Sequence, residues 1–359
     1  MTPPVQQVNT ESQYLVPVDE MKKFMVDALK TAGVTQDHAS QQAELLMSAD
    51  SRGHYSHGLN RLHIYVNDVK SGMNAKEGSP KILKQKGSTA WVDGENLLGA
   101  VVGNFCMDLA IKLAKEHGVG WVTAKQSNHF GIAGHYSLRA AAHGLVGISM
   151  TNASPLVFPT RSSEIGLGTN PIAFVASAQN GDNFALDMAN STVALGKVEL
   201  ATRKGKTEVP PGWGADQHGT PTTDAKKILN DGGYKGTGLS MMVETLCGVM
   251  SGAGFGQNIR RWNSVSELAN LGQCFIAVDP ECFAPGFPAR LQQFIDETRN
   301  LKPANPSKPV LVAGDPERNH LAKGQKLGGL MYHGSQIEYI NKIAKELKVV
   351  PCSFKEIVE

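Results

Sequence analysis

The chain has 359 residues, of which 41% are hydrophobic and 19% charged, so it is a globular protein long enough for two domains or one large α/β unit. Its 35 Lys and Arg residues nearly balance its 33 Asp and Glu residues, and no block of like charges stands out, which argues against nucleic acid as a partner. No run approaches the roughly 18 apolar residues of a membrane span and the five cysteines form no C-x-x-C pair, so we expect a cytoplasmic protein without membrane insertion or a disulfide framework.

The opening segment has the periodicity of helices. Apolar residues recur at helical spacing over residues 17–33, a stretch that ends on a glycine. Two more helices are predicted over about 36–50 and about 57–72. Each is preceded by a hydroxyl residue suited to an N-cap, Thr35 and Ser56. The chain therefore begins with a helical module.

The pattern then changes to strands. TAWVDG and GWVTAKQS read as strands on either side of a helix, VVGNFCMDLAIKLAKEHG, that Gly118 closes. LVGISMTN, PIAFVASA and NFALDMA follow too closely for a helix between each pair, so a mixed or antiparallel sheet is expected. Residues 201–235 are the most loop-like part.

The last third alternates between the two patterns. GTGLSMMVETLCGVMSG reads as an apolar helix, QCFIAVDP as a strand and FPARLQQFIDETRNLK as a helix. PVLVAG is predicted to be a strand, and SQIEYINKIAKELK a final amphipathic helix. No internal repeat is visible.

The stretch DSRGHYSHGLNR, residues 50–61, is the first concentration of chemistry. If a helix begins at Ser56, His57 lies in its first turn and Arg61 one turn later on the same face. An arginine fork and backbone amides suit a carboxylate, and a histidine beside them exchanges a proton near neutral pH. One alternative is a merely capped helix with solvated histidines. The other is a metal site using His54 and His57, with Asp50 as a further candidate ligand, although the H-x-x-H spacing differs from that of zincins.

Two further regions have the composition of binding loops. QSNHFGIAGHYS, residues 126–137, places Asn128 and His129 just after a strand, where α/β proteins bind ligands, although a hydrogen-bonded turn would look the same. Three glycine-bearing stretches, GLGTNP, ALDMANSTVALGK and GGYKGTG, could bring backbone close to a pyrophosphate or be ordinary turns. None is a G-x-G-x-x-G fingerprint, so a nucleotide would not sit on a Rossmann site.

Together these motifs resemble the malate/L-lactate dehydrogenase family of the non-Rossmann type, which includes malate, ureidoglycolate and sulfolactate dehydrogenases and diketogulonate and piperideine-carboxylate reductases. The matching stretches are SRGHYSHGLNRL, SNHFGIAGHYS, TNASPLVFPT, GLGTNPIAF, LDMANS, GGYKGTGLSMMVETLCG and FIAVDP, in this order over residues 51–280. VAGDPE extends the likeness to Glu317.

The resemblance implies a mixed α/β fold with two domains. A non-Rossmann nicotinamide-binding domain with a mixed, partly antiparallel sheet is expected over residues 86–286. A helical substrate and dimerisation domain is expected from residues 1–85 together with 287–359. The resemblance also implies a homodimer that binds NAD or NADP and a small 2-oxo or 2-hydroxy acid, with no resident metal.

By motif position, the resemblance assigns His57 and His129 as the catalytic histidines without deciding which is the acid/base. It assigns Ser56, Arg61 and Asn128 to the substrate. The residues it assigns to the cofactor are Thr169, Asn170, Asp187, Met188, Ala189, Asn190, Ser191, Thr192, Val193, Tyr234, Lys235, Gly314, Asp315 and Pro316.

Two departures from the family pattern bear on these assignments. Ala153-Ser154-Pro155 stands where ureidoglycolate-type members carry a lysine, which ranks that substrate lower. Asp315 stands where glutamate is commoner and is one methylene shorter.

The leading hypothesis is hydride transfer between a nicotinamide and a small 2-hydroxy acid, with one histidine moving the hydroxyl proton and Arg61 holding the carboxylate. The close alternative is an imine or opine-type reductase acting on C=N. More distant alternatives are a metal-dependent hydrolase or lyase built on His54, His57 and His129, and a nucleotide-binding protein without catalysis.

Overall fold

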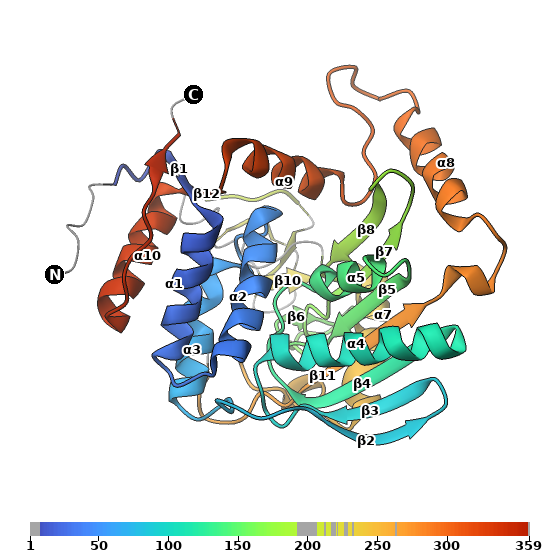
Figure 1. Ribbon diagram of the computed structural model, residues 1–359, viewed down its shortest axis with the longest axis horizontal. Coiled ribbons are helices and arrows are strands. Elements are labelled where there is room, and N and C mark those ends of the chain that lie inside the picture. The colour runs from blue at the N-terminus through green and yellow to red at the C-terminus, as the bar shows by residue number, and fades with distance from the viewer. Residues whose placement is uncertain are drawn as a thin grey trace. The chain divides into compact units, whose positions relative to one another are not determined.

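The computed structural model, shown in Figure 1, describes residues 8–191, 207–211, 213–216, 220, 222–225, 229–231, 233–262 and 264–357. The chain divides into two compact units. The first joins Met1–Gly78 to Asp315–Glu359, and the second is Ser79–Gly314. Both ends of the chain thus belong to one unit, and residues 287–314 belong with the second unit and not with the C-terminal segment.

Helices dominate the first unit. α1 (Val18–Lys30) packs against α2 (Gln36–Ser51), as the apolar spacing predicts. The Thr35 side chain accepts from the backbone N–H of His38, which confirms it as the N-cap of α2. α9 (Asp315–Leu327) and α10 (Gly334–Leu347) come from the other end of the chain. They flank an antiparallel sheet in the order β12 (Leu330–His333), β1 (Gln13–Val16) and β13 (Lys355–Glu356).

The predicted third helix is wrong at its start. A 3₁₀ turn, η1 (Leu59–Arg61), leads into α3 (Leu62–Lys70), so the helix begins five residues later than expected. Ser56 is not an N-cap, because residues 54–58 form an irregular turn. The helix starts late because the buried carboxylate of Asp50 accepts a hydrogen bond from the backbone N–H of Leu59 at 2.9 Å.

The second unit is built on a seven-stranded sheet. Its order is β2 (Lys81–Lys86), β3 (Thr89–Asp93), β4 (Val119–Ser127), β11 (Leu271–Val278), β5 (Val146–Thr151), β7 (Ile172–Ser177) and β8 (Asn183–Met188). β3 and β4 are parallel and all other neighbours are antiparallel, which confirms the predicted mixed sheet. A smaller sheet joins β6 (Val157–Phe158), β10 (Leu229–Asp231) and β9 (Gly214–Ala215).

β11 runs through the middle of the sheet and is buried along almost its whole length. Alternate residues face opposite sides, as the pleat requires. Phe275 meets the rings of Phe130 and Tyr136 on the side of α4 (Gly99–His117) and α5 (Gly134–Ala141). Cys274 and Ile276 lie on the opposite face of the sheet. There they form a buried cluster with side chains of α7 (Gly233–Glu244) and of the π-helical turn that follows it. Helices therefore cover both faces of the central strands (Figure 1).

One expectation for the last third needs correction, because PVLVAG is not a strand. Its Ala313 O accepts from Ala185 N of β8 at 3.1 Å. Directly after it, Asp315 begins α9. The apolar helix exists as α7 (Gly233–Glu244), and it continues as a π-helical turn over Thr245–Val249.

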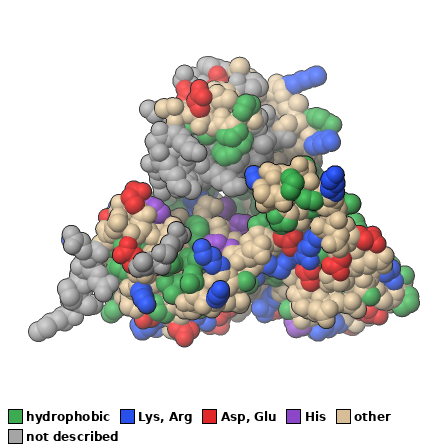
Figure 2. Space-filling view, turned by 90° about the horizontal axis from the view of Figure 1, so that it is seen from above, with side chains coloured by type: hydrophobic (Ala, Val, Ile, Leu, Met, Phe, Trp, Pro, Cys, Tyr) green, Lys and Arg blue, Asp and Glu red, His purple; other side chains and the backbone are tan. Residues whose placement is uncertain are grey.

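The charge distribution agrees with the composition. Acidic and basic side chains are interspersed on the face in Figure 2, with no continuous stripe of one sign. Within the described residues, no helix combines the length and apolar character needed to cross a membrane.

Candidate active site

The turn between α2 and α3 brings Ser56, His57 and Arg61 together. Ser56 Oγ lies 2.9 Å from His57 Nδ1. Arg61 Nε donates to the backbone carbonyl of Ser56 at 2.7 Å, and its backbone N–H donates to Gly58 O at 2.9 Å. These bonds hold an imidazole beside a guanidinium on one short turn, although the helix start expected to present them is absent.

The electrostatics of this turn keep His57 neutral. Burial, followed by the positive charge of Arg61 and then by His54, lowers the pKa of His57 to about 3. At neutral pH the ring therefore has a lone pair that can accept a proton. An anion beside Arg61 would offset one of these causes, so ligand charge and the basicity of His57 are coupled.

His54 lies beside an acidic side chain of α9. Its Nε2 lies 3.5 Å from Glu317 Oε1 on α9, which is an ion pair only when the ring is protonated. Among the residues that the structure describes, no group of three His, Cys, Asp or Glu side chains could hold a metal ion. The geometry of the turn suits an anion and a proton better.

His129 occupies a tightly supported loop after β4. Its backbone N–H donates to Asn128 Oδ1 at 2.7 Å, and its Nδ1 accepts from the backbone N–H of Gly131 at 3.3 Å. In a neutral ring, a lone pair on Nδ1 places the proton on Nε2. This ring is therefore prepared to donate a hydrogen bond through Nε2.

Two contacts beneath the loop fix where His129 lies. Gln273 of β11 donates to the carbonyl of Asn128 at 2.9 Å, and both of these residues are buried. Gly99 at the start of α4 has no room for a side chain, because a Cβ there would lie 2.2 Å from His129 O. The helix start and the loop therefore touch backbone to backbone.

The three glycine-bearing stretches form one cluster. Asn190 N–H donates to Thr169 O at 2.9 Å, and Asn190 Nδ2 donates to Asn170 O at 2.5 Å. A Cβ on Gly236 of α7 would lie 2.3 Å from Asn190 O, so the third stretch presses against the same residue. Segments distant in sequence thus converge, as expected of a binding region.

Asn170 has a structural task within this cluster. Its fully buried side chain donates to Glu244 Oε2 at 2.7 Å and accepts from Ala153 N at 3.0 Å. Glu244 Oε1 also accepts hydrogen bonds from Asn152 Nδ2 and from the backbone N–H of Gly256, each at 3.0 Å. Sequence reasoning missed Glu244. An acid inside an otherwise apolar helix was the signal available.

The start of α7 fits the pyrophosphate of a nicotinamide dinucleotide. α7 begins with glycine-rich backbone, and its exposed first turn carries Tyr234 and Lys235. Helix N-termini and a lysine both attract phosphate. Next to it the buried Asn190 Oδ1 lacks a hydrogen-bond partner among the described residues, as an acceptor reserved for a ligand would. The residues present therefore suit the cofactor that the family resemblance implies.

Other predicted cofactor residues are engaged elsewhere. Asp187 Oδ2 accepts from Gly134 N at 2.8 Å, which ties the end of β8 to the His129 loop. Asp315 Oδ1 pairs with Arg318 at 2.5 Å within α9. Met188 is exposed, Ala189 partly exposed and Ser191 buried. Gly314, with φ +97°, and Pro316 lie where the chain passes from the second unit into the first. Thr192 and Val193 lie outside the described residues.

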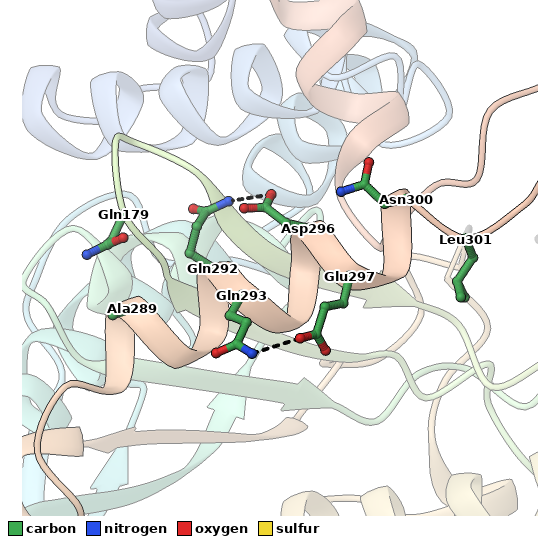
Figure 3. A pocket seen from close by; sticks show the side chains of 8 residues that line it. All are labelled: Gln179, Ala289, Gln292, Gln293, Asp296, Glu297, Asn300 and Leu301. Carbon is green, nitrogen blue, oxygen red and sulfur yellow. Dashed lines mark hydrogen bonds between the residues drawn. The ribbon is translucent and has the colours of Figure 1, made fainter.

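An open pocket of about 700 Å³ beside α8 (Phe287–Arg299) contains none of the predicted site residues. Figure 3 shows its polar side chains bonding to one another along the helix, Gln292 to Asp296 and Gln293 to Glu297. The remaining lining residues are Gln179, Ala289, Asn300 and Leu301. The two bonds join successive turns of α8, and none of the motifs contributes to the lining, so we assign the pocket no function.

Comparison with known proteins agrees with the resemblance. Residues 16–341 match the protein family described as malate/L-lactate dehydrogenase. The chain is 38% identical over 354 residues to malate dehydrogenase of Pyrococcus horikoshii, covering 94% of this chain and 97% of the relative. It is 33% identical over 292 residues to the NAD(+) ureidoglycolate dehydrogenase of Escherichia coli K12, covering 80% and 83%. The solved sulfolactate dehydrogenase of Methanocaldococcus jannaschii superimposes with a TM-score of 0.85 at 35% identity, covering 93% of this chain and 98% of that one.

The neutral state of His57 can be tested directly by NMR titration of its imidazole. We expect the ring to stay unprotonated down to pH 5, because burial and Arg61 lower its pKa to about 3. Arg61→Gln removes the positive charge, so the pKa of His57 should rise toward the ordinary value. Protonation of His57 near pH 6.5 in the parent protein would contradict this electrostatic account.

Proposed function

The chain belongs to the malate/L-lactate dehydrogenase family, and from that premise we propose that it interconverts a small 2-hydroxy acid and its 2-oxo acid with NAD or NADP. The observation that carries the proposal is the joint placement of His57 and Arg61 on one turn. An imidazole that exchanges a proton and a guanidinium that grips a carboxylate are the two groups this reaction needs from the protein.

Arg61 is the residue we assign to the substrate carboxylate. Its Nε already donates to Ser56 O, which fixes the plane of the guanidinium. The Nη atoms then address a carboxylate side by side, a geometry that sets which face of the reacting carbon is presented. The proposed substrate is a small acid, because the guanidinium of Arg61 and the imidazole of His57 together span only a few atoms.

We assign different roles to the two histidines. His57 is neutral at pH 7, so it accepts the hydroxyl proton during oxidation and returns a proton to the carbonyl oxygen during reduction. His129 presents an Nε2–H, because its Nδ1 accepts from Gly131, and it donates a hydrogen bond to the substrate oxygen. Asn128 acts through His129 by accepting that residue's backbone N–H.

The nicotinamide supplies or receives the hydride when it is bound. The residues we assign to it are the glycine-rich start of α7 with Tyr234 and Lys235, and the neighbouring Thr169 and Asn190. Lys235 and the helix start offset phosphate charge, while Asn190 offers a buried acceptor. Comparing turnover with NADH and with NADPH shows whether the adenosine ribose of the cofactor carries a phosphate.

We also propose that the protein is a homodimer through α7 and its π-helical turn. The buried residues of α7 are Gly236, Ser240, Val243 and Glu244, of which Val243 alone has a large apolar side chain. Large apolar side chains of the helix and of the turn that follows it are exposed instead, among them Leu239, Met241, Met242, Val249 and Met250. A face of this kind gains free energy when a second copy removes it from water.

The function is tested by a panel of 2-oxo acids with NADH and with NADPH. We expect absorbance loss at the nicotinamide wavelength with oxaloacetate, pyruvate or a sulfonated analogue, because Arg61 recognises the shared 2-oxo carboxylate. The same panel with added amines detects reduction of C=N. Turnover that requires an amine would replace the first proposal by the imine reductase, and no turnover with either cofactor would refute both.

The histidine roles are tested by replacing His57 and His129 in turn with alanine and with glutamine. His57 is the proton carrier, so both of its variants should lose turnover by about 10²–10⁴-fold. Glutamine can still donate a hydrogen bond, so His129→Gln should keep more activity than His129→Ala. The matched control is His143→Ala, which alters an exposed histidine at the end of α5. Equal losses for His129→Gln and His129→Ala would exclude the donor role.

The dimer is tested by Met241→Glu in sedimentation. A charge in the apolar face should convert the dimer to monomer, because it cannot be buried without a partner. Phe294→Glu on α8 is the matched control, since Phe294 is also exposed but lies away from this face. A monomeric parent protein would refute the proposed dimer. Dissociation by Phe294→Glu but not by Met241→Glu would place the dimer contact away from α7.

A further inference from the structure

Asp50 is a buried acid that the proposed reaction does not use. It lies in the last turn of α2, is 1% exposed, and sits at the helix end whose dipole disfavours a negative charge. Burial raises the pKa of its carboxyl group to about 7. An apolar residue would fill this position at lower cost, so its retention needs a reason beyond packing.

The contacts of the carboxylate point to that reason. Asp50 Oδ2 accepts from the hydroxyl of Tyr332 at 2.7 Å and from the backbone N–H of Leu59 at 2.9 Å. Tyr332 belongs to β12, which is anchored in the three-stranded sheet. Asp50 therefore connects a rigid strand to the turn that carries His57 and Arg61.

The bond to Leu59 controls the orientation of one peptide plane. The N–H of Leu59 and the C=O of Gly58 belong to the same trans peptide, so they point in opposite directions. The N–H points to Asp50, and the C=O accepts from the backbone N–H of Arg61 at 2.9 Å. Rotation of this peptide would break both bonds and move Arg61.

Gly58 shows how closely the carboxylate fits the turn. A Cβ at this position would lie 1.9 Å from Asp50 Oδ1 and 2.2 Å from its carboxyl carbon. The backbone between His57 and Leu59 is therefore in direct contact with the carboxyl group of Asp50. A larger residue at 58 would force the turn away from it.

We propose that Asp50 is a positioning residue for the reaction, which holds the Gly58–Leu59 peptide so that His57 and Arg61 address one substrate. This inference rests on the proposed function of those two residues. Asp50 touches neither substrate nor cofactor in this scheme. It acts through the backbone, and its essential property is a hydrogen-bond acceptor at the position of Oδ2.

The test compares Asp50→Leu/Tyr332→Phe with Tyr332→Phe alone. The double variant removes the acceptor and the hydroxyl together, so no unpaired hydroxyl remains and the buried charge is gone. We expect its melting temperature and NADH affinity to match those of Tyr332→Phe. Its kcat/KM for the 2-oxo acid should fall by about 100-fold, the cost of a small misplacement of catalytic groups.

A conservative variant separates acceptor from charge. Asp50→Asn keeps an oxygen that can accept from Leu59, so it should retain activity within about tenfold of the parent. Equal kcat/KM in the double variant and in Tyr332→Phe would overturn the proposal. So would a loss in Asp50→Asn as large as in the double variant. If the double variant does not fold, Gly58→Ala decides, since parent-like activity with a Cβ against Asp50 contradicts the proposal.

A readout without turnover distinguishes this proposal from the function itself. Displacement of Arg61 from His57 removes a positive charge from the imidazole, so NMR should show the pKa of His57 rising in the double variant. An unchanged titration of His57 would overturn the positioning role even if no substrate is found. Absence of 2-oxo acid turnover by the parent protein would instead refute the proposed function.

Discussion

The buried carboxylate of Glu244 is the constraint on which the cofactor side of the second unit depends. A carboxylate removed from water is costly unless donors surround it, and three donors reach this one. They come from Asn152, Asn170 and Gly256, which lie after β5, before β7 and after the π-helical turn. These three loops must converge for Glu244 to be satisfied. Their convergence sets the backbone of Asn170, on which Asn190 and the end of β8 are placed.

Features decided by neighbouring residues could be predicted from the sequence. Gly118 ends α4 with φ +84°, as a glycine at the end of a helical pattern should, and Thr35 caps α2. QCFIAVDP was expected to be a strand, and it forms β11. Short strands spaced too closely for crossover helices indicated the mixed sheet. The resemblance to the family, confirmed by the match over residues 16–341, rests on motifs of this local kind.

The errors arose where a distant residue decides the local structure. The helix expected from His57 begins later, because Asp50 accepts from the backbone N–H of Leu59. The same carboxylate oxygen accepts from the hydroxyl of Tyr332, which lies far along the chain. PVLVAG has a strand composition, but it forms no strand although Ala313 O accepts from Ala185 N of β8. α9 was missed because its sequence, DPERNHLAKGQKL, has few apolar residues and buries little beyond Asp315. Periodicity is a weak signal for such a helix.

The candidate site shows the same division. The motifs indicate His57, Arg61 and His129 as candidate ligand-binding side chains, but not the structural roles of the buried acids. Asp50 was considered only as a candidate metal ligand, and Glu244 was read as part of a helical pattern. Each accepts hydrogen bonds from loop backbone or amide groups of the turns that carry the motifs. A single sequence shows which residues are acidic, but only the fold shows which of them are buried beneath a turn.

The coupling between Arg61 and His57 links charge recognition to proton transfer. Burial and Arg61 together hold the imidazole neutral, and an anion paired with Arg61 offsets the second cause. Linkage makes the effect reciprocal, since an anion that raises the pKa of His57 is itself bound more tightly when His57 is protonated. The proposed 2-oxo and 2-hydroxy acids both carry a carboxylate, so either of them would offset this cause on pairing with Arg61. The charge of the substrate and the proton on His57 would therefore be coupled in both directions of the proposed reaction.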